Sequence, residues 1–426
     1  MRIAVIGSGI AGLGAAWSLS RQHEITLIEA ADKPGGHTNT VTVDTPDGPI
    51  GIDTGFIVHN PVNYPNLIRM LSMLDVQTQP STMSFALSAG NGRLEYSGGG
   101  RLTGLFAQLS LLLRPSHWRM LIDILRFFRL TKRLLAADNL PEVTLGQFLD
   151  DHGFSSELQR RFLCPMAGAI WSTPAEATRA FPFPAFARFY ESHGLLNLFK
   201  RPKWRTISGG SQRYVDAMLA DFSGKLRLST PVESIRRCPA GVIVTTAAGE
   251  ETFDAVVCAV HGDVAARLLA DADDSEAAVL GAVRYAENRA ILHTDQRLMP
   301  RRRLTWSSWN VLQAADTLDA SPVCLSYWMN LLQALDTEEE YIVTLNPIRE
   351  PDPRRVLYET VYTHPQYTAE TIAAQQHLPA IQGKRGIWWC GAWTGYGFHE
   401  DGFTSGLDVA RALGCPPPWE HSADQP

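Results

Sequence analysis

The sequence predicts an α/β protein (α+β in its second part) in which a Rossmann-type βαβ domain is interleaved with a mixed domain of sheet and helices. Three observations predict this fold class. A buried strand, a glycine-rich turn and a helix follow one another in residues 2–19. A second buried-strand pattern, DAVVCAV, returns at residues 254–260, and a third strand runs into glycines and a helix at residues 386–413. Strands that leave a sheet and return after long insertions are typical of such an interleaved architecture.

The first element is a strand–turn–helix unit with the spacing of a dinucleotide-binding motif. Residues 2–6 (RIAVI) are a short apolar, β-branched run, and residues 11–19 have helical spacing. Between them Gly7 permits a tight turn, and Gly9 lets a pyrophosphate approach the backbone with no Cβ in the way. Gly12 allows the helix to pack closely on the strand. The start of the helix offers unpaired N–H groups and a positive dipole end to the phosphates.

An acidic residue completes this motif. The second strand, residues 24–28, ends in Glu29, where a carboxylate accepts hydrogen bonds from ribose hydroxyls. An ordinary strand-to-helix turn is the alternative interpretation of the glycines alone. Because strand, helix and acid occur together at the right spacing, we predict that the chain binds a dinucleotide.

The composition indicates a globular chain of two or three domains. Its 426 residues are 45% hydrophobic and 19% charged, and the formal net charge of -6 gives no reason to expect nucleic acid. The six cysteines are scattered, so we expect a reduced cytoplasmic protein with neither a disulfide framework nor a metal site. The chain opens into a strand and lacks an uncharged apolar run of about eighteen residues. We therefore expect neither a signal peptide nor a membrane span.

Residues 101–135 stand out because they are both basic and apolar. Bulky apolar side chains recur at helical spacing, at Trp118, Leu121, Ile122, Leu125 and Phe128. Arginines recur along one flank, at Arg119, Arg126 and Arg133. Basic amphipathic helices of this kind can lie on an anionic bilayer, so we expect peripheral contact with the inner face of the cytoplasmic membrane. The alternative is a substrate-domain helix with its charges in water.

Two segments supply candidates for a substrate chamber. His59 and Asn60 either line the chamber or cap the following helix. Residues 284–380 are rich in aromatic and amide side chains, which suit a long, weakly polar substrate. Many of these aromatics belong to a core, and the candidates for the chamber are Trp306, Trp309, Asn310, Tyr327 and Asn330.

The chain also resembles a known superfamily at both ends. Gly35-Gly36 follows six residues after Glu29, and the segment GIWWCGAWTGYGFHEDG (386–402) precedes the last helix. Both are similar to the flavoprotein amine oxidase superfamily, which includes monoamine and polyamine oxidases, phytoene desaturase and protoporphyrinogen oxidase. The resemblance implies FAD as the cofactor and an amine-oxidase-like fold. Lys33 and His37 stand where this family usually has arginine.

The resemblance implies a set of FAD contacts and a division into domains. In the N-terminal part the contacts are Gly7, Gly9, Ile10, Ala11, Gly12, Glu29, Ala30, Lys33, Gly35, Gly36, His37, Thr38, Gly55 and Phe56, with the Val232 backbone at the adenine edge. In the C-terminal part they are Gly391, Gly397, Phe398, His399, Glu400, Asp401 and Gly402. Segments 1–65, 205–283 and 384–415 would bind FAD, 66–204 and 284–383 would bind substrate, and 416–426 would form a tail.

Departures from the family pattern argue against an amine substrate. Amine oxidases place a tyrosine beside the flavin in the second loop, where this chain has Phe398. They also keep a lysine near flavin N5, where the matching strand offers Asn288 or Arg289. Ala392 replaces the acid that often follows the first glycine of the closing signature.

The whole chain is more similar to a bacterial branch of the superfamily, known as predicted NAD/FAD-binding proteins. The segments that carry this resemblance are residues 35–40, 53–58, 306–310 and 397–402. The branch is associated with membrane fatty-acid modification beside cyclopropane-synthase-like methyltransferases, including desaturation toward furan fatty acids. The resemblance therefore implies a lipid acyl-chain substrate and a functional partnership with such a methyltransferase.

The hypothesis from the sequence is an FAD-dependent acyl-chain desaturase. Hydride would pass to flavin N5 while a base or water removes a proton from the neighbouring carbon. The candidate bases are His59, His293, Tyr327 and His399. The alternatives are a redox-neutral fatty-acid double-bond isomerase, an amine oxidase, and a non-enzymatic FAD-bound scaffold.

Overall fold

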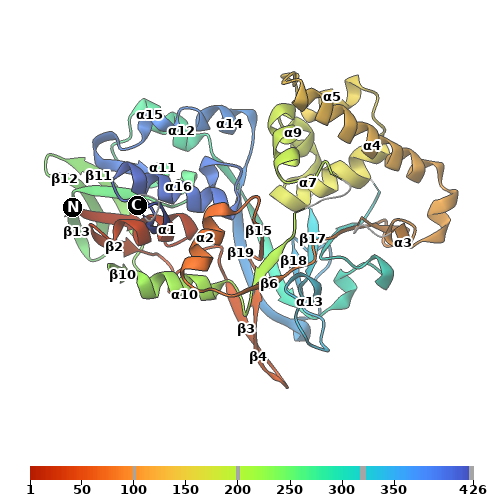
Figure 1. Ribbon diagram of the computed structural model, residues 1–426, viewed down its shortest axis with the longest axis horizontal. Helices are drawn as coiled ribbons and strands as arrows, with labels where there is room; N and C mark the ends of the chain where they lie inside the picture. The colour runs from red at the N-terminus through yellow and green to blue at the C-terminus, as the bar shows by residue number, and fades with distance from the viewer. Residues whose placement is uncertain (99–101, 198–201, 317–322, 422–426) are drawn as a thin grey trace.

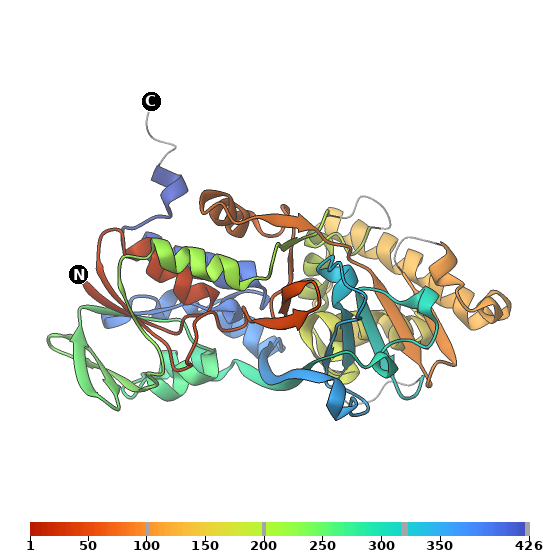
Figure 2. The ribbon, with the colours of Figure 1, turned by 90° about the horizontal axis from the view of Figure 1, so that it is seen from below.

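The computed structural model describes residues 1–98, 102–197, 202–316 and 323–421. In this part of the chain two large sheets lie next to each other along the long axis of the molecule (Figure 1). The N-terminus and the last described helix lie in the half that holds the first sheet. The helices of residues 102–136 lie in the opposite half (Figure 2).

The first sheet is parallel and confirms the predicted Rossmann-type domain. Ile3 and Val5 face one side of this sheet, while Ala4 and Ile6 face the other, and all four are buried. Both faces are covered, so the strands are apolar at successive positions and do not alternate. The strand order is β10 (Lys225–Arg227), β2 (Glu24–Ile28), β1 (Arg2–Ile6), β14 (Ala255–Cys258) and β20 (Ile387–Trp389).

Helices cover one face of this sheet, and a small sheet with two helices covers the other. The first layer holds α1 (Ile10–Leu19), α2 (Pro65–Met73), α10 (Gln212–Asp221) and α16 (His399–Ala412). The second holds β11 (Val232–Cys238), β12 (Gly241–Thr246), β13 (Gly249–Phe253), α11 (Gly262–Leu268) and α12 (Asp274–Gly281).

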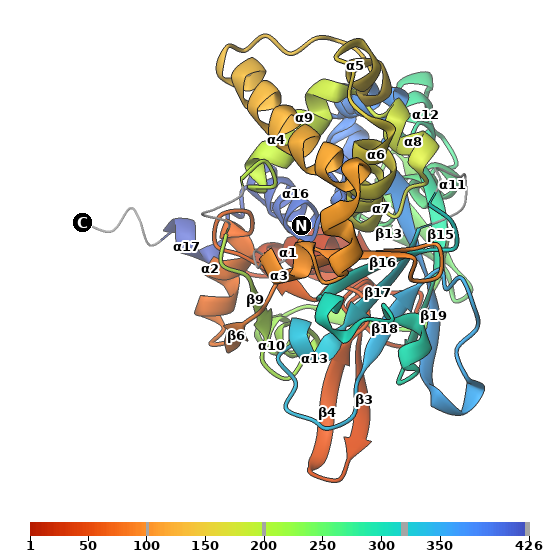
Figure 3. The same ribbon diagram turned by 90° about the vertical axis from the view of Figure 1, so that its right-hand side faces the viewer.

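The second sheet is antiparallel except for one parallel pair, and helices pack on one of its faces (Figure 3). Its order is β19 (Val356–Gln366), β15 (Arg284–His293), β18 (Ile342–Leu345), β17 (Cys324–Trp328), β16 (Trp309–Gln313), β7 (Phe85–Ala89) and β8 (Leu94–Ser97). The helices are α3 (Leu102–Leu105), α4 (Pro115–Ala136), α5 (Leu145–Asp151), α6 (Ser156–Leu158), α7 (Cys164–Trp171), α8 (Ala175–Ala180) and α9 (Phe183–Ser192).

Short elements connect the two halves. One of them is the antiparallel hairpin β3 (Thr40–Thr45)–β4 (Gly48–Asp53), and another is the small sheet β5–β9–β6, which comprises Val58–His59, Arg205–Ile207 and Thr78–Pro80. After β17, α13 (Met329–Leu332) begins the loop to β18. Helices α14 (Ala369–Gln375) and α15 (Leu378–Ile381) pack against α12, although the sequence placed their residues in the substrate-binding segment 284–383. The short α17 (Pro418–His421) follows α16.

The long helix expected in residues 101–135 is present as α4. Of the apolar residues that recur at helical spacing, Trp118 and Ile122 are 44% and 56% exposed, whereas Phe128 is buried. Met120 and Phe127 are fully buried, so apolar residues occur on more than one side of this helix. No helix in the described part of the chain is long and apolar enough to cross a bilayer.

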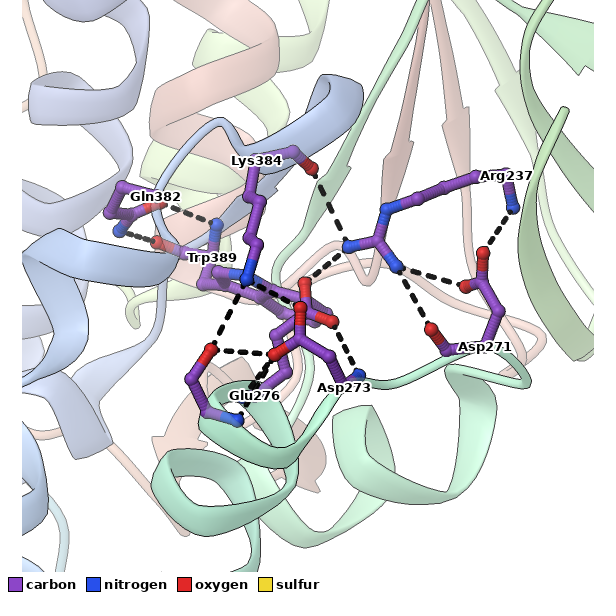
Figure 4. A network of polar contacts seen from close by, with 8 residues as sticks. Arg237, Asp271, Asp273, Glu276, Gln382, Lys384 and Trp389 are labelled. Carbon is purple, nitrogen blue, oxygen red and sulfur yellow. Dashed lines mark hydrogen bonds and ion pairs between the residues drawn. The ribbon is translucent and has the colours of Figure 1, made fainter. Parts of the chain in front are cut away.

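A network of polar contacts joins β11, α12 and the segment before β20 (Figure 4). The buried Arg237 guanidinium pairs with the fully buried Glu276 carboxylate, and it donates to Asp271 over 2.9 Å. Lys384 pairs with Asp273, whose side chain caps the N-terminus of α12. These contacts fix the second covering layer to the edge of the parallel sheet.

Candidate functional site

A cavity of about 470 Å³ extends from the glycine-rich turn to the second sheet. At one end it is lined by Gly7, Gly9, Ile10, Ala11, Glu29, Gly35 and Gly36. At the other end it is lined by Ala169, Ile170, Trp309, Tyr327 and Leu345. The cavity therefore spans the junction between the two halves of the molecule.

The N-terminus of α1 opens into this cavity without a side-chain cap. Its first-turn N–H groups are therefore free to bind an anion, and the helix dipole adds a favourable field. Gly7 has φ +94°, which glycine adopts at little cost, and a Cβ at Gly12 would collide with the Gly7 carbonyl oxygen. At Gly9 a Cβ would meet no protein atom within 4 Å, because this position borders open cavity.

The Glu29 carboxylate is held at the wall of the cavity by the turn itself. One carboxylate oxygen accepts hydrogen bonds from the Ser8 N–H (2.7 Å) and hydroxyl (2.6 Å), and the other accepts from the Ala31 N–H (2.9 Å). These bonds orient the carboxylate and leave acceptor capacity for ribose hydroxyls.

Residues from the C-terminal segment complete the cavity wall. Gly391, Gly397, Phe398 and His399 line it, and α16 begins at His399. The His399 imidazole stacks on Phe56 at 3.8 Å and shares a 2.5 Å hydrogen bond with the Tyr214 hydroxyl. Burial lowers the pKa of His399 to about 3, so its ring is neutral at pH 7.

Comparison with known proteins identifies the group that this geometry accommodates. A sequence model of the family described as flavin containing amine oxidoreductase matches residues 10–339. The chain belongs to this family. Its cofactor is accordingly FAD, which fits the uncapped helix start, the open side of Gly9 and the oriented Glu29 carboxylate.

Individual relatives agree with this assignment. The chain is 26% identical to "Putative flavin-containing monoamine oxidase AofH" of Mycobacterium tuberculosis over 276 residues, 61% of this chain and 56% of that protein. The chain thus matches only about half the length of that curated relative. Among solved structures, cyclohexylamine oxidase from Brevibacterium oxydans has a TM-score of 0.68 at 16% identity, covering 97% of this chain and 99% of that one. The CLA-producing fatty acid isomerase from P. acnes has a TM-score of 0.67 at 15% identity, covering 97% of this chain and 98% of that one.

The cofactor residues predicted from the sequence fall into two groups. Gly55, Phe56 and His37 line the cavity together with those named above. The remaining predicted residues are not among the described residues that line the cavity. They are Gly12, Ala30, Lys33, Thr38, Val232, Glu400, Asp401 and Gly402.

Four residues of this second group hold neighbouring segments in place through hydrogen bonds. The Lys33 ammonium bonds the Asn39 side chain, and the Thr38 hydroxyl bonds Tyr214. Glu400 accepts hydrogen bonds from the first N–H groups of α2, and burial raises its pKa to about 6. Asp401 accepts from the N–H groups that precede α16.

The four candidate bases do not share one location. Tyr327 and His399 line the cavity, whereas His59 is buried beside it with no hydrogen-bond partner among the described residues. The structure does not place the fourth candidate, His293, in the cavity. Its Nε2 shares a 2.8 Å bond with the Thr344 hydroxyl and its Nδ1 accepts from the Asp295 N–H, so neither nitrogen is free and the ring lies outside the described lining.

The residues proposed for the substrate chamber divide in the same way. Trp309 and Tyr327 line the cavity, with their rings edge to face at 5.4 Å. Asn60 instead accepts hydrogen bonds from the N–H groups of Val62 and Asn63 in the loop before α2, and α2 itself has no side-chain cap. Trp306, Asn310 and Asn330 likewise bond nearby main chain, outside the described lining, so placing them in the chamber was wrong.

Several other residues line the cavity that were not among the predicted site residues. They are His261, Tyr285, Tyr362, His364 and Trp393. Tyr362 and His364 are two residues apart on β19 and therefore face the same side of the strand. That spacing was visible in the sequence, but nothing local indicated which face meets the cofactor.

Proposed function

We propose that this protein is an FAD-dependent oxidoreductase that desaturates a lipid acyl chain. One observation carries the proposal: the end of the cavity lined by Ala169, Ile170, Trp309, Tyr327 and Leu345 is apolar and aromatic, and Glu29, at the nucleotide end, is the only carboxylate among the described lining residues. A cationic amine needs a carboxylate or an aromatic cage. An alkyl chain needs neither.

The aromatic groups at this end support the same conclusion. Phe398 has no hydroxyl, and its ring stacks against Phe189 at 5.0 Å. Burial raises the pKa of Tyr327 far above pH 7, so its hydroxyl remains protonated. These groups form an apolar slot with few polar atoms, a surface suited to hydrocarbon.

This geometry suggests which role belongs to the flavin and which to the protein. When bound, the flavin supplies a two-electron acceptor. The protein orients the acyl chain beside it and excludes water. Of the remaining candidate bases, only Tyr327 and His399 line the cavity; Tyr327 is protonated at pH 7, whereas the His399 ring is neutral and shares a hydrogen bond with Tyr214 through Nε2.

Anaerobic mixing of the holoenzyme with unsaturated phospholipids and with small amines tests the proposal. We expect the flavin absorbance to bleach with a phospholipid and to stay unchanged with amines. Bleaching by amines, with peroxide released in air, would instead establish an amine oxidase. A shifted double bond formed without bleaching or an electron acceptor would establish an isomerase, which the fold shared with the fatty acid isomerase keeps as the second candidate.

We also propose that the helices of residues 102–136 contact an anionic membrane at its cytoplasmic face. Leu109 and Leu113 are 77% and 87% exposed, and Trp118 is 44% exposed. Arg114 and Arg119, near these residues in the sequence, and Arg129 and Arg133, further along α4, form no ion pair with other described residues. Exposed apolar side chains flanked by unpaired arginines complement an anionic lipid surface.

A cyclopropane-synthase-like methyltransferase as functional partner belongs to the same proposal. Such an enzyme would supply the methylated acyl chain that this protein oxidises. Co-expression should then yield an oxidised methylated lipid that neither enzyme produces alone. Formation of that product without the methyltransferase would remove the partner from the scheme.

A further inference from the structure

Three imidazoles meet on the cavity wall from three separate segments of the chain. The ring of His37 lies 5.8 Å from that of His261 and 5.6 Å from that of His364. No lysine or arginine is among the described residues that line the cavity. The Lys33 ammonium is bonded to the Asn39 side chain instead. Besides the indoles of Trp309 and Trp393, the imidazoles are therefore the nitrogen-bearing side chains among the described lining residues.

A relay of two amides fixes the direction of every hydrogen bond that reaches His364. The Arg289 N–H donates to Asn346 Oδ1 over 3.1 Å, and Asn346 Nδ2 donates to Asn288 Oδ1 over 2.7 Å. Asn288 Nδ2 then donates to the Ala286 carbonyl over 3.1 Å and to His364 Nδ1 over 2.9 Å. A backbone N–H only donates and a carbonyl only accepts, so both ends of the relay set the amide orientations.

This relay determines the form of the His364 ring. Since Nδ1 accepts a hydrogen bond, it carries no proton, and in the neutral ring the proton is on Nε2. Burial and the nearby His261 lower the pKa of His364 to about 4, so the ring is neutral at pH 7. His364 thus offers a single, fixed Nε2–H donor at the cavity.

The position of His37 indicates which part of the cofactor meets this donor. A Cβ at Gly36 would lie 3.2 Å from Gly9 Cα, so the Gly35-Gly36-His37 loop rests on the phosphate-binding turn. His364 neighbours His37 and therefore faces the phosphate half of the cavity.

We propose that His364 binds the FAD pyrophosphate through Nε2–H, and that Asn288 and Asn346 position it by holding that tautomer. Neutral donors would thereby replace the arginines usual in this loop. The inference rests on the flavin cofactor of the family and is independent of the acyl-chain substrate.

The test measures binding of FAD and of ADP, which carries the pyrophosphate without ribityl or flavin, to the apoprotein. We expect His364→Leu to weaken both ligands about equally, by about tenfold to a hundredfold, as for loss of a hydrogen bond to a charged group. His377→Leu, at an exposed histidine, should change neither affinity. Loss of FAD affinity with ADP affinity intact would overturn the assignment to the pyrophosphate.

Nitrogen NMR of the imidazoles examines the relay without any need for catalysis. In the wild-type holoenzyme we expect an unprotonated Nδ1 and a protonated Nε2 at His364. Asn288→Asp replaces the donor with an acceptor, so Nδ1 should become protonated and the affinity for ADP should depend on pH between about 5 and 8. A protonated Nδ1 in the wild type would refute the inference.

Discussion

At the scale of single residues, glycines of one motif have distinct roles that the surrounding atoms define. Gly12 is small because the Gly7 carbonyl occupies the space of its Cβ, a constraint of folding. Gly9 is small although no protein atom is near, a constraint of ligand binding. The surrounding atoms thus agree with the different roles that the motif predicts for the two glycines.

Gly9→Ala should therefore fold and fail to bind FAD. The added methyl group enters the cavity, so we expect the affinity for FAD to fall at least tenfold, equivalent to about 1.4 kcal/mol. The apoprotein should lose no more than about 1 kcal/mol of stability, the effect of alanine at this N-cap position. Fluorescence titration with FAD and urea denaturation of the apoprotein measure the two quantities.

Gly281→Ala is the matched control, since a Cβ at Gly281 would also meet no atom within 4 Å, but this residue lies at the exposed end of α12. The variant should retain FAD affinity. Equal loss of affinity in both variants would contradict the role given to Gly9.

At the scale of elements, α12 and β11 depend on one buried ion pair. The Arg237 and Glu276 side chains are 5% and 0% exposed, and removing Glu276 leaves the buried guanidinium paired only with Asp271, which is 34% exposed, among the described residues. Glu276 also accepts the Asp273 N–H, which closes the capping box of α12.

Glu276→Gln should lower the free energy of unfolding by about 3 kcal/mol, the range for breaking a buried pair. The neighbouring pair Arg236–Glu250 provides the control, because its side chains are 43% and 52% exposed. Glu250→Gln should cost less than about 1 kcal/mol. Similar urea midpoints for both variants would show that burial does not set the strength of this contact.

A separate prediction concerns the exposed apolar residues of α4 and of the segment before it. Changing Leu109 and Leu113 to serine removes exposed apolar surface without disturbing the core. We expect binding to phosphatidylglycerol vesicles in a sedimentation assay to fall about tenfold. Met73→Ser, at a 50% exposed site on the other half, should bind as the wild type does. Equal binding of all three proteins would rule out this face as the membrane contact.

At the scale of the whole molecule, burial shifts the pKa of several histidines and of two carboxyl groups. Burial lowers the pKa of His37 and His399 to about 3, and that of His59, His293 and His364 to about 4. Burial also raises the pKa of Asp53 and Glu400 to about 6.

The stability of the apoprotein should therefore fall as pH decreases from 6.5 toward 4. In this range the unfolded chain protonates its histidines while the folded chain does not, at about 1.4 kcal/mol per pH unit for each fully titrating group. Asp53 and Glu400 oppose this, because they bind protons in the folded state first, but five histidines outnumber them. Urea midpoints at pH 7 and pH 5 measure the sum, and a higher midpoint at pH 5 would contradict it.

The sequence predicted the parts of the molecule that local patterns determine. Gly7, Gly9 and Glu29 belong to one short unit, so their spacing was sufficient to indicate their positions. The amide relay was not predictable, because Asn288 and His364 meet only after β15 and β19 pair. The positions of the candidate substrate-binding residues were not predictable for the same reason.

Trp306 and Asn310 were expected in the chamber on composition, which says nothing about the direction of a side chain. Asn310 bonds the main chain of Ser307 and Ser326, while Trp309 beside it faces the cavity. Adjacent strand residues point to opposite faces, and only the completed sheet shows which face meets the cofactor.

The long pairing of β15 with β19 has a mechanical consequence. The two strands pair from Arg284–Gln366 to Leu292–Tyr358, with a register shift before His293–Val356, and Tyr285 at one end stacks on His261 of the nucleotide-binding half. A ladder of this length resists bending, so we expect the cavity wall that β19 supplies to keep its backbone shape when a ligand enters. Side-chain rotamers, rather than the backbone of these two strands, would then adapt to the ligand.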